Sequence, residues 1–92
     1  MNATTRESFR EAILRVLEER ASNRFGLSVN AIVIFLAQFG FRAAAIAEVN
    51  AELLYLQDKN FVAIVGKPIS PENTCWRITA DGRDHVAQGS NE

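Results

Sequence analysis

Cysteine, histidine and proline are all scarce in this sequence of 92 residues, which contains one Cys, one His and two Pro. A single cysteine excludes an internal disulfide and a zinc site built from several cysteines, and it suits a reducing compartment. The only histidine, His85, has no nucleophile near it at a recognisable catalytic spacing. We therefore expect a non-enzymatic cytoplasmic protein that uses no metal and no cofactor.

Long apolar runs and a strong excess of either charge are also missing. The longest apolar run, residues 31–37, is far shorter than the roughly 20 residues of a membrane helix, and no basic segment precedes an apolar stretch at the start. The formal net charge is −1, so the molecule as a whole does not attract polyanions. We expect no membrane association, and any contact with DNA must come from local charge.

The composition that remains is that of a small globular domain. Hydrophobic residues make up 48% of the chain and charged residues 23%. We expect one domain over residues 1–88, followed by a disordered tail at 89–92. Because a domain of this size has room for only one small core, a homodimer would add to its stability.

The clearest helix is predicted near the N-terminus, where Thr4 and Glu7 form a capping-box pattern. The buried face recurs at helical spacing and consists of Phe9, Ala12, Ile13, Val16 and Leu17. The opposite face alternates arginine with glutamate at spacings that favour ion pairs within the helix. We interpret it as a solvated surface rather than a phosphate-binding one; its members are Arg6, Arg10, Glu11, Arg15, Glu18, Glu19 and Arg20.

The segment from residue 29 to residue 39 suits either a helix or a buried strand, because it is rich in β-branched and aromatic residues. We predict a helix, since Ser28 or Asn30 can cap its start, Gly40 can close its end, and its length exceeds that of a typical strand. Its apolar side chains then point in nearly every direction, which requires burial by the domain or by a partner. This excess apolar surface is one reason to expect a homodimer.

A third helix is predicted from Arg42 to Asn60, because one apolar stripe recurs at helical spacing. The stripe consists of Ile46, Val49, Leu53 and Leu56. Asn60 tolerates the left-handed backbone angles that a helix C-cap often needs. The Ala-rich character of this helix also permits close approach of a second helix, a second reason to expect a dimer.

Two strands are predicted next, at Phe61 to Gly66 and at Cys75 to Thr79, joined by a long hairpin tip that contains both prolines. Trp76 and Ile78 alternate with Arg77, as in a half-buried strand. Thr79 is expected to cap a short final helix from Ala80 to about Gln88. The order of elements predicts an α+β fold, a winged helix-turn-helix with a three-helix core, a two-stranded β-hairpin wing and a short C-terminal helix.

Three segments carry a resemblance to a known group of proteins: Phe39-Gly40-Phe41-Arg42, residues 51–62 (AELLYLQDKNFV) and residues 76–84 (WRITADGRD). They contain a helix end of the form Leu-x-x-Lys and a later Trp-Arg-x-Thr-x-x-Gly. The chain resembles the small winged-helix, ArsR-like proteins of Mu-like transposable bacteriophages and prophages. The resemblance implies a transcriptional or phage-cycle regulator in a bacterial host. Asn60 stands where many winged helices carry Gly.

If the domain binds double-stranded DNA, the third helix and the hairpin are the expected contacts. The candidate DNA-binding residues are Arg42, Asn50, Lys67, Arg77 and Arg24. Asn50 has the chemistry to read an adenine, and the four basic residues have the chemistry to hold phosphates. The alternatives are that Asn50 is a solvated helix residue and that Lys67 and Arg77 are charges that protect a strand edge.

The expected outward face of the third helix argues for a second hypothesis. It consists of Ala44, Ala47, Glu48, Ala51 and Glu52. Its two carboxylates suit phosphates poorly, and as an i, i+4 pair they are only a weak signal for a cation. The alternative is a protein-interaction module, in which the apolar second helix and the Ala-rich, acidic third helix dock another phage or host protein.

Cys75 is expected to be a small, buried apolar residue.

Overall fold

The computed structural model describes residues 3–20, 25–66 and 74–89. Within these ranges it describes the side chains from residue 6 onward. The described residues form an α+β domain with four α-helices, one short 3₁₀ helix and three strands. In chain order these are α1 (Ala3–Glu19), β1 (Leu27–Ser28), α2 (Val29–Leu36), η1 (Ala37–Phe39), α3 (Ile46–Asp58), β2 (Val62–Val65), β3 (Cys75–Ile78) and α4 (Ala80–Gly89).

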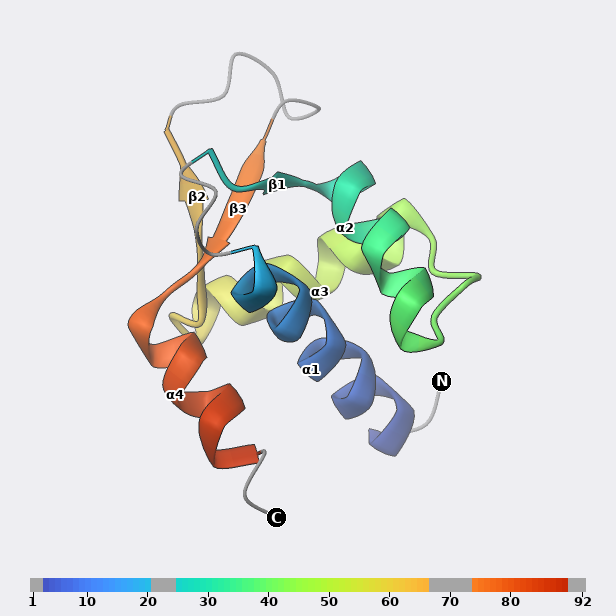
Figure 1. The fold of residues 1–92 in the computed structure, drawn as a ribbon, viewed down its shortest axis with the longest axis horizontal. Helices are drawn as coiled ribbons and strands as arrows, with labels where there is room; N and C mark the ends of the chain where they lie inside the picture. The colour runs from blue at the N-terminus through green and yellow to red at the C-terminus, as the bar shows by residue number, and fades with distance from the viewer. Residues whose placement is uncertain (1–2, 21–24, 67–73, 90–92) are drawn as a thin grey trace.

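The three strands form one antiparallel sheet in the order β1-β3-β2. Trp76 in the central strand pairs with Leu27 on one side and Ile64 on the other. Helix α1 contacts the other three α-helices and β3. Figure 1 shows α2 and α4 on opposite sides of α1, with the sheet at one end of the helices.

The core gathers around α1, whose predicted apolar stripe is confirmed: Phe9, Ala12, Ile13, Val16 and Leu17 are all buried. Leu14, outside that stripe, is buried as well. The remaining buried apolar side chains come from every other α-helix and from the sheet: Leu27, Ile32, Leu36, Val49, Leu53, Leu56, Val62, Trp76, Ile78 and Val86.

On α1 the polar face follows the prediction only in part. The ion pair between Glu11 and Arg15 lies within the helix, with 2.9 Å between Oε1 and Nη2, as the spacing predicted. Arg10 instead pairs with Glu52 of α3. The helix begins at Ala3, so Thr4 lies inside its first turn rather than ahead of it, and the predicted cap hydrogen bond of Thr4 falls outside the described side chains.

The second segment is helical, as predicted, and the strand alternative is wrong. The Ser28 hydroxyl caps α2 by accepting a hydrogen bond from the backbone N–H of Ala31 at 3.2 Å. The helix tightens into η1 and ends at Gly40, whose φ of 92° is left-handed. Of the apolar residues on α2, Ile32 and Leu36 are buried, whereas Ile34 is 67% exposed.

The third helix is shorter than predicted. It begins at Ile46 rather than Arg42, because Ala45 is extended (φ −89°, ψ 149°) and its N–H donates to Glu48 Oε1 at 3.3 Å. The chain ahead of it turns so that Phe41 packs edge-on against Phe9, with ring centroids 5.2 Å apart. Ile46 is 54% exposed, so its predicted place in the buried stripe is wrong. At the other end, Asn60 adopts the predicted left-handed conformation, with a φ of 65°.

The prediction of a two-stranded sheet is also wrong, because β1 adds a third strand. Its two residues pair with Trp76 and Cys75 on the free edge of β3. A strand of two residues is too short to produce a detectable alternation of apolar and polar side chains. The predicted hairpin strands are confirmed at β2 and β3, and Trp76 and Ile78 are buried while Arg77 is exposed.

The Trp-Arg-x-Thr-x-x-Gly pattern forms the junction between α3, β2 and α4. The Thr79 hydroxyl accepts from the N–H of Gly82 at 3.1 Å, which confirms the predicted cap, and donates to the carbonyl of Asn60. The N–H of Thr79 donates to the Phe61 carbonyl at 3.0 Å. A Cβ at Gly82 would lie 2.2 Å from that carbonyl oxygen, so this position requires glycine for the close approach.

Candidate nucleic-acid interface

Helix α3 is the element that a DNA-reading helix-turn-helix would insert into the major groove. It packs on α2, which precedes it in the chain. Val49, Leu53 and Leu56 anchor its inner side in the core. The opposite side is exposed, and we call Ala47, Ala51 and Leu54 the α3 outer face.

The charges of α3 are unusual for a DNA-reading helix. Between Ile46 and Asp58 there is no Lys or Arg, and there are three carboxylates, those of Glu48, Glu52 and Asp58. Arg and Lys make the commonest specific contacts to bases and also neutralise phosphates. Two amide side chains on α3 have the chemistry to read a base edge, the exposed Asn50 and the half-buried Gln57. Of these, only Asn50 lies in the N-terminal half of the helix, the part that enters the groove.

Three of the five candidate DNA-binding residues lie in the described part of the chain. Arg42 is exposed in the turn before α3, Asn50 is exposed on α3, and Arg77 is exposed on β3. Among the described residues, none of the three takes part in an ion pair, so Arg42 and Arg77 keep their charges available for phosphates. Arg24 and Lys67 lie outside the described residues.

Glu52 was predicted to lie on the outward face of α3, and this prediction is wrong. Its carboxylate accepts from Arg10 Nε, and its side chain is only 16% exposed. The Arg10 guanidinium also lies over the Tyr55 ring, 3.7 Å from the centroid. This contact joins α1 to α3 and compensates one of the three negative charges of α3. Ala44, another residue predicted to point outward, is partly buried against the core.

Sequence reasoning also missed the largest apolar side chain of the α3 outer face. Leu54 is 51% exposed, although it follows directly after the fully buried Leu53. The available signal was its position outside the stripe formed by Val49, Leu53 and Leu56. With Leu54 flanked by Ala47 and Ala51, the outer face is apolar, and the exposed carboxylates of Glu48 and Asp58 border it.

Two further residues singled out in the sequence have packing contacts. His85 stacks on Phe61, with ring centroids 4.6 Å apart and an interplanar angle of 22°. Cys75 is partly buried rather than fully buried. Within residues 3–20, 25–66 and 74–89, no three His, Cys, Asp or Glu side chains cluster as metal ligands would, and no helix has the length and apolar character needed to cross a membrane.

Comparisons with protein-family models, with curated proteins and with solved structures find no match to this chain.

Proposed function

We propose that this chain is a winged-helix protein of phage or prophage origin that binds double-stranded DNA as a transcriptional or phage-cycle regulator in the host cytoplasm. The observation that carries the proposal is the arrangement of α2, the turn and α3, with an exposed side of α3 and a β2-β3 hairpin following it. This is the order of a helix-turn-helix and its wing. The resemblance to winged-helix proteins of Mu-like phages supports the same assignment.

The charges determine how such a protein would hold DNA. Arg42 lies just before the N-terminus of α3, where the helix dipole also favours a phosphate. Arg77 offers a second phosphate contact from β3. Phosphate contacts position a protein without specifying sequence, and Asn50 is the one amide side chain in the N-terminal half of α3. Most of the affinity would therefore be independent of sequence.

Substitutions at the two arginines test this mode of binding. Arg42→Gln and Arg77→Gln are each expected to weaken binding to a labelled mixed-sequence duplex and to make the slope of log affinity against log salt less steep by about 0.9, the value for one phosphate contact. Fluorescence anisotropy measures both quantities. Arg83→Gln removes another exposed charge, on α4, and serves as the matched control. Equal affinities for all three variants and the parent protein would contradict these contacts.

We also propose that the protein is a homodimer. Ile34 is 67% exposed on α2, an apolar side chain that a second copy would cover. Light scattering at micromolar concentration is expected to give the mass of two chains for the parent protein and of one chain for Ile34→Glu. Gln88→Glu introduces the same charge at an exposed position of α4, on the opposite side of α1 from α2, and should leave the dimer intact. A parent protein with the mass of one chain would exclude the dimer.

A second candidate function is favoured by the α3 outer face itself. An exposed stripe of Ala47, Ala51 and Leu54 between carboxylates suits a protein partner with an apolar surface bordered by Lys or Arg. If the chain serves as such a protein-interaction module, Leu54→Arg should abolish capture of a phage or host partner, whereas Arg77→Gln should not. The opposite pattern, with DNA binding weakened in Arg77→Gln and retained in Leu54→Arg, favours the wing as a DNA contact.

A further inference from the structure

A cavity of about 490 Å³ lies where α1, the C-terminal half of α3 and α4 meet. Its volume falls in the range of pockets that hold small organic ligands. The cavity lies at the opposite end of α3 from Arg42 and Asn50, and the proposed DNA contacts do not use it. The residues that line the cavity therefore have no role in the proposed DNA contact.

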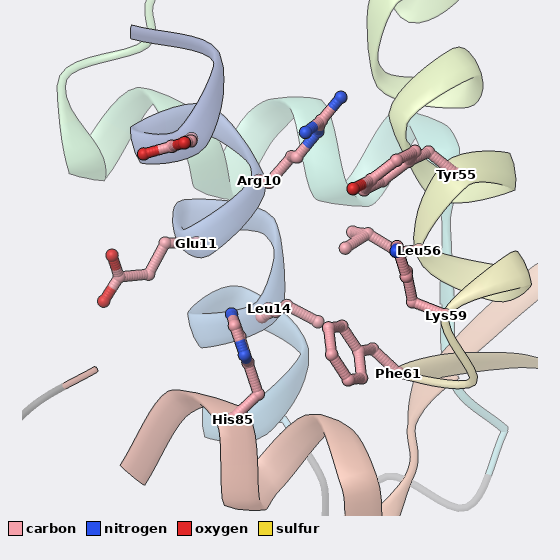
Figure 2. Close-up of a pocket in the computed structure, with 9 residues that line it drawn as sticks. Arg10, Glu11, Leu14, Tyr55, Leu56, Lys59, Phe61 and His85 are labelled. Carbon is pink, nitrogen blue, oxygen red and sulfur yellow. The ribbon is translucent and has the colours of Figure 1, made fainter. Parts of the chain in front are cut away.

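The base of this cavity is apolar and two of its sides are aromatic. Leu14 and Leu56 are buried beneath it. Phe61 forms one side and is held by its stack on His85, and Tyr55 forms another. Figure 2 shows the Phe61 and Tyr55 side chains on the α3 side of the cavity, with His85 rising from α4 beside Phe61. Such a lining suits a ligand with a flat apolar body.

Most of the charged groups around the cavity already have partners. Arg10 pairs with Glu52 and lies on the Tyr55 ring. Glu11 accepts a hydrogen bond from Arg15, and its carboxylate points away from Lys59 and Phe61 in Figure 2. Glu7 is exposed on the α1 side.

Lys59 lies at the side of the cavity that Tyr55 and Phe61 form. Among the described residues, Lys59 has no ion pair. Its ammonium lies 5.7 Å from the Tyr55 ring centroid, and in Figure 2 its side chain runs alongside Leu56 in the direction of Tyr55. A ligand carboxylate placed there would gain a charge-assisted hydrogen bond.

We propose that this cavity binds a small aromatic carboxylate. The ring lies over Leu14 and Leu56 beside Phe61, and the carboxylate accepts a hydrogen bond from the Lys59 ammonium. The site is built from residues that the proposed DNA interface does not include, so it does not depend on DNA binding. A ligand held there would contact α1, α3 and α4 at once.

The experiment is a titration of the ¹⁵N-labelled protein, without DNA, followed by amide chemical shifts. Sodium phenylacetate is the probe. Phenethylamine, which has the same ring and the opposite charge, and acetate, which has no ring, are the matched controls. The variants are Lys59→Gln and, for an exposed cation elsewhere on the surface, Arg83→Gln. The spectrum of each variant also shows directly whether it is folded.

Phenylacetate is expected to produce saturable shifts centred on Leu56, Lys59, Phe61 and His85. Loss of the charge-assisted hydrogen bond in Lys59→Gln should weaken binding by about tenfold, while Arg83→Gln should bind as the parent protein does. Neither control compound should saturate. The proposal is overturned if phenylacetate gives no saturable shift up to about 10 mM, if Lys59→Gln binds as tightly as the parent, or if phenethylamine binds equally well.

Discussion

Leu53→Ala is expected to lower the free energy of unfolding by about 2 to 5 kcal/mol, the range measured for removal of a buried leucine side chain. Leu53 is fully buried in the middle of α3. The substitution removes apolar contacts and leaves a cavity that the surrounding helices fill only in part. Denaturation by urea, with the midpoint and slope both fitted, measures the loss.

The neighbouring residue supplies the matched control for this prediction. Leu54→Ala removes the same atoms from a side chain that is 51% exposed, so we expect a change within about 0.5 kcal/mol, as is usual at surface positions. The pair therefore tests which side of α3 faces the core. Similar losses for the two variants would show that the orientation of α3 described above is wrong.

Gly26→Ala is expected to be about as damaging, with a loss of roughly 2 to 5 kcal/mol from left-handed strain and overpacking together. Gly26 has a φ of 72°, and a Cβ there would lie 2.6 Å from the Trp76 carbonyl oxygen and 2.9 Å from Val65 Cγ2. The clash falls on the central strand of the sheet. The added methyl group must therefore displace β1 from β3 or move the strand itself.

Gly40→Ala separates strain from steric clash. Gly40 has a φ of 92°, yet no atom would lie within 4 Å of a Cβ placed there. We therefore expect Gly40→Ala to cost only the conformational term, about 1 to 2 kcal/mol. If the two variants lose the same stability in urea denaturation, the close approach of Gly26 to β3 is not what the substitution disrupts.

The fold could be predicted from sequence wherever residues close together in the chain determine the local structure. The stripe of α1, the Ser28 cap, the left-handed Asn60 and the alternation around Trp76 all follow from local rules, and each is present. The start of α3 and the strand β1 could not be predicted in the same way. The first depends on Phe41 packing against Phe9, and the second depends on pairing with a strand about fifty residues away.

For the candidate site, the sequence predicted the exposure of individual residues but not the contacts between them. The exposure of Asn50 and Arg77 follows from helical and strand periodicity. The pairing of Glu52 with Arg10, 42 residues away in the chain, does not, because side-chain partners across helices depend on how the helices cross. For the same reason, the cavity that joins Lys59 to Phe61 and His85 left no pattern in the sequence.

A salt titration of binding to a mixed-sequence duplex tests most directly our proposal that this domain binds double-stranded DNA through a few phosphate contacts. With the four basic candidates Arg24, Arg42, Lys67 and Arg77 each engaging one phosphate, we expect a slope of log affinity against log salt of about −3.6 for one chain and about −7 for a dimer. Saturable binding with a slope in this range would support the DNA interface. Absence of binding even at low salt would contradict it, and would leave the apolar, acid-bordered outer face of α3 as a surface for a protein partner.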